Sequence, residues 1–205
     1  MGKKVFAIIL ALLGWFALIA QFTIMMENRQ ASVMETSIRF FSFFTVLTNL
    51  IVTIYFTSLI FSKEQQLSKV NQTEVLTAIT IFITMVGLVY QIALRHLWQP
   101  KGLQLVVDEL LHTIIPLLTI IFWYLYDSTQ RVKYARILVW AIYPLVYLVY
   151  ILVRGSASDY YPYPFVNVTK LGLTAVLINS GMLLLIFVTI SALFLFIGKS
   201  VIKRT

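Results

Sequence analysis

Six long apolar stretches dominate the sequence and restrict what the chain can fold into. They run approximately over residues 5–25, 38–61, 76–94, 103–126, 137–153 and 171–197. A helix needs about 20 mostly apolar residues to cross the hydrocarbon core of a bilayer. The stretches are too long for the strands of a membrane barrel, and a backbone in lipid must satisfy its own hydrogen bonds. The sequence therefore predicts an all-α polytopic membrane protein, a bundle of six transmembrane helices.

The composition excludes several functions. Apolar residues make up 60% of the chain, and the net charge of +8 comes from Lys and Arg that stand singly between apolar runs. Nucleic-acid binding needs a basic stripe, which this pattern does not provide. The chain has no Cys and only 2 His, which excludes thiol catalysis and metal sites rich in Cys or His. We therefore expect no nucleic-acid partner, and the sequence implies no metal or organic cofactor.

The distribution of Lys and Arg predicts the orientation in the membrane, because cytoplasmic connections carry an excess of these residues. The larger set comprises Lys3, Lys4, Lys63, Lys69, Arg131, Lys133, Arg136, Lys199, Lys203 and Arg204. The smaller set comprises Arg29, Arg39, Arg95, Lys101, Arg154 and Lys170. Both termini are thus expected in the cytoplasm. Since the connections are short and no repeat occurs, residues 1–205 are expected to form a single domain.

Polar residues within the predicted spans concentrate near their outer ends. A charged group at the centre of a transmembrane helix costs about 2.5–3.5 kcal/mol, so each one needs a reason. The residues concerned are Thr45, Thr48, Asn49, Arg95, Asp108, Glu109, His112, Arg154 and Asn179. The other halves of the spans hold mainly apolar residues with Ser and Thr, which bond back to their own helix. This one-sided pattern predicts a cavity open toward the outer leaflet rather than a channel, which carries polar lining throughout.

Asp108 and His112 form a candidate acid–base pair. Their spacing of four residues places both on one helix face, where the carboxylate can fix the tautomer of the imidazole. Pro116 cannot donate to the carbonyl of His112, which loosens the helix at this point. Thr45, at equal predicted depth, offers a hydroxyl that a neighbouring base can activate as a nucleophile.

Other interpretations use the same residues. Asn49, Thr48 or a freed backbone amide are alternative donors to an oxyanion. A threonine in a membrane often only bonds back to its own helix, and a buried histidine with carboxylates also suits a proton relay or interhelical hydrogen bonds. Asp108 and Glu109 have arginines as alternative partners. A small-molecule or proton-coupled transporter and a membrane scaffold are therefore the alternatives to an enzyme.

Two segments carry a resemblance to a known family. Residues 41–49 (FSFFTVLTN) and 108–116 (DELLHTIIP) resemble the androgen-induced gene and ADTRP family, also called FAR/AIG-like, and the related bacterial six-pass family labelled Pr-six-Pr. The Tyr-Pro pair at 143–144 and the loop at 154–165 resemble the bacterial branch especially. The resemblance spans most of the chain and implies a location in the bacterial inner membrane.

The resemblance implies intramembrane hydrolysis of lipid esters, with fatty acid esters of hydroxy fatty acids as the substrates of the eukaryotic members. It implies Thr45 as the nucleophile and His112 as the general base. The spacing after Thr45 departs from the eukaryotic pattern, which leaves Thr48 as a rival nucleophile. The orienting role of Asp108 comes from its spacing and not from the family. The predicted substrate-binding residues are Asn49, Thr48, Glu109, Arg95, Arg154 and Asn179, with the two arginines as partners of a substrate carboxylate.

Overall fold

The computed structural model describes residues 2–61, 69–126 and 132–200. This part of the chain is helical and contains no β-strand, which confirms the all-α prediction. Its 6 helices that are long and apolar enough to cross a membrane cover Lys3–Glu27, Phe44–Phe61, Thr73–Leu97, Leu103–Tyr126, Arg136–Ser158 and Leu173–Ser200. The chain is therefore an integral membrane protein with a six-helix bundle.

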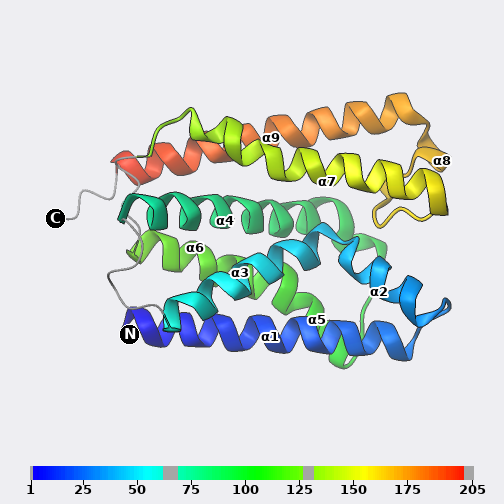
Figure 1. Cartoon of the computed structure of the whole chain (residues 1–205), viewed down its shortest axis with the longest axis horizontal. Coiled ribbons are helices and arrows are strands. Elements are labelled where there is room, and N and C mark those ends of the chain that lie inside the picture. The colour runs from blue at the N-terminus through cyan, green and yellow to red at the C-terminus, as the bar shows by residue number, and fades with distance from the viewer. Residues whose placement is uncertain (1, 62–68, 127–131, 201–205) are drawn as a thin grey trace.

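The long helices lie side by side, and both ends of the chain are at the same end of the bundle (Figure 1). They are α1 (Lys3–Glu27), α3 (Phe44–Phe61), α4 (Lys69–Val89), α6 (Ile115–Tyr126), α7 (Arg136–Ser158) and α9 (Leu173–Ser200). The short helices α2 (Val33–Phe41) and α8 (Val168–Leu171) lie at the opposite end, called the far end below. Four basic residues used to predict the orientation lie outside the described residues, namely Lys63, Arg131, Lys203 and Arg204. Which side faces the cytoplasm stays a prediction.

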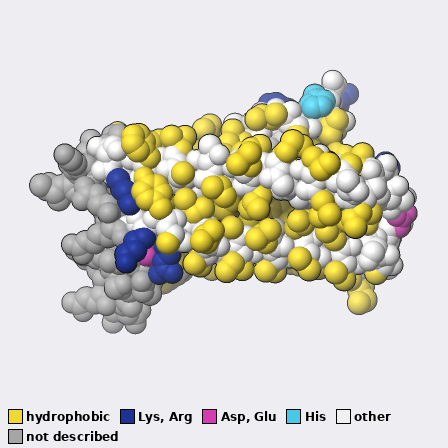
Figure 2. Space-filling view, turned by 90° about the horizontal axis from the view of Figure 1, so that it is seen from above, with side chains coloured by type: hydrophobic (Ala, Val, Ile, Leu, Met, Phe, Trp, Pro, Cys, Tyr) yellow, Lys and Arg dark blue, Asp and Glu magenta, His cyan; other side chains and the backbone are white. Residues whose placement is uncertain are grey.

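The surface of the bundle is apolar, as a surface in contact with lipid must be. Seen from the side of α7 and α9, hydrophobic side chains cover its length, with Lys and Arg toward the two ends (Figure 2). Leu138, Val146 and Val149 of α7 and Leu185 and Phe196 of α9 are all more than half exposed. Soluble monomeric proteins rarely expose an apolar surface of this extent.

The core is densest between α1, α3, α4 and α6. Phe56 and Phe122 are fully buried there, with their rings edge to face and centroids 4.9 Å apart. Gly14 of α1 lies so close to Thr53 of α3 that a Cβ would collide with that side chain, and small residues permit such close helix packing in membranes. The Thr53 and Thr119 hydroxyls donate to carbonyls four residues earlier. This confirms the prediction that such residues bond back to their own helices.

The second predicted span, 38–61, is not one continuous helix, because the helix is interrupted between the end of α2 at Phe41 and the start of α3 at Phe44. The amides of Ser42 and Phe43 bond to carbonyls three residues back, and the Ser42 carbonyl accepts a hydrogen bond from Tyr147 Oη at 2.8 Å. This contact with α7 draws the carbonyl away from the helical ladder. Thr45 is consequently the second residue of α3 rather than a residue two turns inside a longer helix.

Two π-helical turns interrupt the third and fourth spans at the same level of the bundle. One turn, Tyr90–Leu94, extends α4, and the other, Leu110–Ile114, joins α5 (Leu103–Glu109) to α6. The second turn contains His112, which agrees with the loosening predicted from Pro116. Gly87 of α4 makes room for it, since a Cβ there would lie 3.2 Å from the His112 carbonyl oxygen. Single π turns are frequent at functional sites.

An ion-pair cluster joins α2 to α7 at the far end. Glu35 accepts hydrogen bonds from Arg39 Nε at 2.7 Å and from Arg154 Nη2 at 2.8 Å. The guanidinium groups of both arginines also stack on the ring of Tyr160. The hydrogen bonds from Arg39, and next those from Arg154, hold the pKa of Glu35 below its ordinary value of 4.5.

This lowered pKa predicts how stability depends on pH. Because the pKa of Glu35 is lower in the folded than in the unfolded state, its stabilisation is present above the unfolded value of 4.5 and is lost as the pH falls through the folded value. We expect the Tm of the wild type to exceed that of Glu35→Gln at neutral pH and the difference to vanish in acid. Thermal unfolding in detergent measures both. Glu27→Gln is the control, and a difference that persists in acid would contradict the prediction.

Candidate active site

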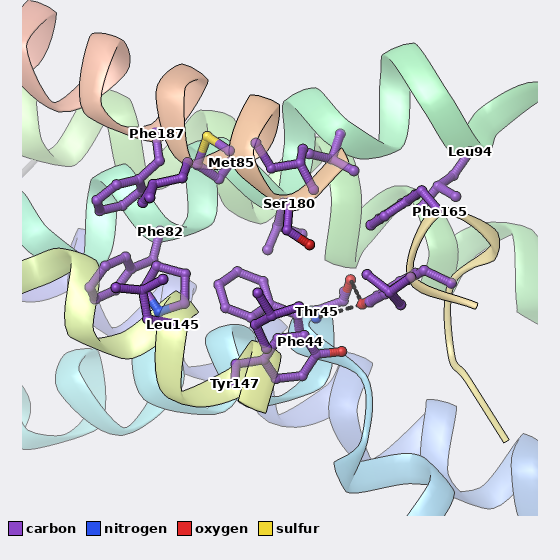
Figure 3. Close-up of a pocket in the computed structure, with 18 residues that line it drawn as sticks. Phe44, Thr45, Phe82, Met85, Leu94, Leu145, Tyr147, Phe165, Ser180 and Phe187 are labelled. Atoms are coloured by element: carbon purple, nitrogen blue, oxygen red, sulfur yellow. Dashed lines mark hydrogen bonds between the residues drawn. The ribbon is translucent and has the colours of Figure 1, made fainter. Parts of the chain in front are cut away.

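Two neighbouring cavities inside the bundle share part of their walls. The first has a volume of about 130 Å³, lies between α3, α4, α7 and α9, and is called the apolar cavity here (Figure 3). The second has a volume of about 290 Å³, lies between α1, α3, α5 and the two π turns, and is called the polar cavity. The far-end segment at 162–164 also contributes to the wall of the polar cavity. Thr45, Leu94 and Tyr163 line both cavities.

Asp108, His112 and Tyr90 form one connected group in the wall of the polar cavity. Asp108 is only 2% exposed, and its Oδ1 lies 3.3 Å from His112 Nδ1. His112 Nδ1 is also 2.9 Å from the Asp108 carbonyl oxygen, while Tyr90 Oη donates to Asp108 Oδ2. The Tyr90 ring stacks on the imidazole with centroids 4.0 Å apart. The two oxygen acceptors beside Nδ1 favour the tautomer with its proton on that nitrogen, in which Nε2 is the acceptor.

Thr45 lies in the wall of the same cavity and is 8% exposed. Its amide donates to Tyr163 Oη at 3.2 Å, and its Oγ1 lies 3.3 Å from the same oxygen. The first amides of a helix have no acceptor within that helix, so the Tyr163 hydroxyl caps the start of α3. The Tyr163 and Thr45 hydroxyls therefore both lie at the positive end of the α3 dipole.

Thr48 and Asn49 line neither cavity, although the sequence predicts both as substrate-binding residues. Both are completely buried. Thr48 Oγ1 is hydrogen-bonded to Tyr143 Oη of α7 at 3.0 Å. Asn49 Nδ2 donates to the carbonyls of Thr45 and Leu111 at 2.9 and 3.2 Å. These contacts occupy the Asn49 donor and direct both side chains toward neighbouring helices. The two residues therefore stabilise the helix packing next to the cavities and do not line them.

The other predicted substrate-binding residues also lie outside both cavity walls. Arg95 pairs with Glu109 and donates to Gln91 Oε1 at 2.9 Å. Arg154 pairs with Glu35 in the far-end cluster, and Asn179 Nδ2 donates to the Phe165 carbonyl at 3.0 Å. Both arginines therefore lie outside the cavity walls and contact acidic side chains of the protein, with Glu35 shared between Arg154 and Arg39.

Several further polar residues of the cavity walls escaped the sequence prediction. Tyr90 follows a run of apolar residues in the sequence, so nothing there marks it as a site residue. Tyr163 lies in an aromatic segment that is typical of a membrane interface. Tyr163 is instead buried, with its ring stacked on Phe165 at 5.3 Å. Gln104 Nε2 donates to Gln21 Oε1 at 2.9 Å in the wall of the polar cavity. A glutamine within an apolar span is a usable signal, because an unpaired amide in lipid is costly.

The Tyr163 hydroxyl is predicted to stabilise the site. Burial raises its pKa, so the hydroxyl remains protonated at neutral pH. Tyr163→Phe leaves the buried Thr45 amide without this acceptor, which is expected to lower the free energy of unfolding by about 1–3 kcal/mol. Denaturant titration in detergent measures the loss. Tyr161→Phe is the matched control in the same segment, and an equal loss in both variants would contradict the role of the Tyr163 hydroxyl.

Within residues 2–61, 69–126 and 132–200, no group of three or more His, Asp or Glu is arranged to hold a metal ion. Comparison of the chain with protein-family models, with curated proteins and with solved structures finds no match.

Proposed function

We propose that the protein is an intramembrane hydrolase of lipid esters, with Thr45 as the nucleophile and His112 as the general base. One observation carries the proposal: Thr45, Asp108 and His112 line the same cavity although they come from two separate membrane spans. A hydroxyl, an imidazole and a carboxylate that orients the imidazole are the groups needed for acyl transfer. The resemblance to the six-pass threonine hydrolases selects the same hydroxyl and imidazole.

The first half of the reaction transfers the acyl group to the protein. Thr45 Oγ1 attacks the ester carbonyl carbon while His112 Nε2 takes the hydroxyl proton. For this step the Thr45 hydroxyl exchanges its bond to Tyr163 for one to His112. The tetrahedral intermediate then collapses, the bond to the alkoxy oxygen breaks, and His112 returns the proton to the leaving alcohol. The product is an acyl-threonine.

The second half releases the acid. His112 Nε2 takes a proton from water, whose oxygen attacks the acyl carbonyl. The bond to Thr45 Oγ1 breaks, the proton moves from His112 to that oxygen, and a fatty acid leaves. Throughout, Asp108 holds the imidazole through Nδ1, and Tyr90 holds Asp108 through its second oxygen.

Backbone amides in the first turn of α3 are the proposed donors to the oxyanion. They lie at the positive end of the helix dipole, beside the nucleophile. Since the Thr45 amide donates to Tyr163 Oη and the Leu47 amide donates to the Phe43 carbonyl, the Val46 amide is the leading candidate. Fixed donors directed at the developing charge stabilise the transition state without reorganisation. This role was open to Asn49 and Thr48 on sequence grounds, but their side chains are occupied elsewhere.

The proposal extends to the setting of the reaction. With both termini in the cytoplasm, the far end and the polar cavity face the outer leaflet of a bacterial inner membrane. Membrane lipids then supply the substrate, and the resemblance implies fatty acid esters of hydroxy fatty acids as one class to test.

Fatty acid release from a panel of lipid esters by purified protein in nanodiscs tests the proposed function. We expect release above the rate of empty nanodiscs for at least one ester class. A matched assay of solute or proton flux in liposomes tests the transporter alternative. Flux without any ester cleavage would overturn the proposal in favour of a transporter.

A further inference from the structure

We propose, on the basis of the proposed hydrolase function, that the substrate is an ester of an uncharged alcohol that carries a free hydroxyl. Its acyl chain lies in the apolar cavity, and its alcohol part lies in the polar cavity against Gln21 and Gln104. This class differs from esters whose alcohol part carries a carboxylate.

Thr45 lies in the wall that the two cavities share, so a substrate bound at Thr45 can place one arm in each cavity. The shared wall residues are Thr45, Leu94 and Tyr163. In Figure 3, Phe82, Leu145 and Phe187 lie on one side of Thr45, and Leu94 and Phe165 lie on the other. A carbonyl placed at Thr45 Oγ1 therefore directs one arm along the apolar cavity and leaves the other arm to the polar cavity.

The apolar cavity is suited to a hydrocarbon chain. Its described wall contains no charged side chain and is formed mainly by Leu, Val, Met and Phe. The Ser180 hydroxyl in this wall is bonded to the Val176 carbonyl at 2.8 Å. Leu145 of α7 lines the cavity and is also 43% exposed. The entrance proposed for the acyl chain lies beside this residue, between α7 and α9.

The polar cavity disfavours an anionic arm. Its described wall contains no Lys or Arg, and its ionisable groups, the tyrosines Tyr90 and Tyr163 apart, are Asp108 and His112. Arg95 and Arg154, the two arginines predicted as partners of a substrate carboxylate, are paired with Glu109 and Glu35 outside the wall. A carboxylate brought into this cavity would lose its hydration without gaining a cation and would face the Asp108 carboxylate.

The two glutamines complement a hydroxyl instead. The hydrogen bond from Gln104 Nε2 to Gln21 Oε1 leaves Gln21 Nε2 as a donor and Gln104 Oε1 as an acceptor, with no other partner among the described residues. A hydroxyl can donate one hydrogen bond and accept another, so it has the chemistry to pair with both groups. A carboxylate satisfies only the donor.

Binding of non-hydrolysable ligands tests the inference without requiring catalysis. The probes are an alkyl ether of glycerol and an alkoxyacetate with the same chain, each brominated near its head group. Trp98 lines the polar cavity, so bromine quenches its fluorescence, and Trp98→Phe supplies the background. We expect the glycerol ether to bind at least about tenfold more tightly at neutral pH, which corresponds to about 1.4 kcal/mol. Equal or tighter binding of the alkoxyacetate would overturn the inference.

Variants separate the two physical causes. Gln104→Leu is expected to weaken binding of the glycerol ether and leave the alkoxyacetate nearly unchanged. Asp108→Asn is expected to tighten binding of the alkoxyacetate, because it removes the negative charge and keeps the size. If neither variant changes the preference, the glutamines and Asp108 do not select the alcohol part, and the inference is overturned.

Hydrolysis of the matched esters distinguishes this inference from the proposed function. Cleavage of both esters with preference for the carboxylate ester would overturn the inference and leave the hydrolase intact. Selective binding of the glycerol ether without cleavage of either ester would overturn the hydrolase and leave a binding site for neutral lipids.

Discussion

Replacement of Thr45 by Ala is expected to lower lipid-ester hydrolysis by about 10⁴-fold or more, the effect typical of losing a catalytic nucleophile. The change removes the attacking oxygen but keeps the backbone amide that is bonded to Tyr163. Helix content and elution in detergent should therefore stay those of the wild type. Thr45→Ser retains the oxygen and should retain most of the activity. Release of fatty acid from the best ester of the panel measures all three proteins.

The matched control is Thr48→Val, one turn further along α3. Valine keeps the shape of threonine and removes the hydroxyl that contacts Tyr143. We expect its activity to stay within several-fold of the wild type. An active Thr45→Ala together with an inactive Thr48→Val would transfer the nucleophile to Thr48.

Replacement of His112 by Gln is expected to reduce kcat by about 10²–10⁴-fold, the usual contribution of a general base. Glutamine fills much of the volume stacked on Tyr90 but cannot take a proton at neutral pH. Because nucleophile and base act as a unit, adding His112→Gln to Thr45→Ala should lower the remaining rate little further. A purely structural role of His112 would instead make the two losses multiply.

His96→Gln is the control for the second histidine of the chain. His96 is exposed near the far end and lines neither cavity. Its replacement should leave kcat unchanged. Full activity of His112→Gln would exclude His112 as the base.

Much of the architecture can be predicted from the sequence because a bilayer imposes simple rules. Length and apolar content alone locate six spans, and the helical repeat places Asp108 beside His112. The missing amide of Pro116 indicates the irregular helix at His112. These features depend on residues close together in the sequence, so no tertiary information is needed to derive them.

The features that sequence reasoning misses depend on distant partners. The break after α2 is stabilised by Tyr147, and the cap of α3 comes from Tyr163, both more than a hundred residues away in the chain. From the sequence alone, Arg95 and Arg154 are candidate partners of an anion. The structure shows that they contact Glu109 and Glu35. The polar wall formed by Gln21 and Gln104 likewise requires α1 and α5 to meet. Side-chain identity predicts which groups need partners, and the fold decides which partners they have.

Covalent labelling with a long-chain alkyl fluorophosphonate tests the central claim most directly. The probe reacts with an activated hydroxyl, and mass spectrometry of peptides from the labelled protein identifies the modified residue. We expect one adduct, on Thr45 Oγ1. Its amount should be strongly reduced in His112→Gln and unaffected in Thr48→Val. An adduct on Thr48, or equal labelling of the wild type and His112→Gln, would contradict this expectation.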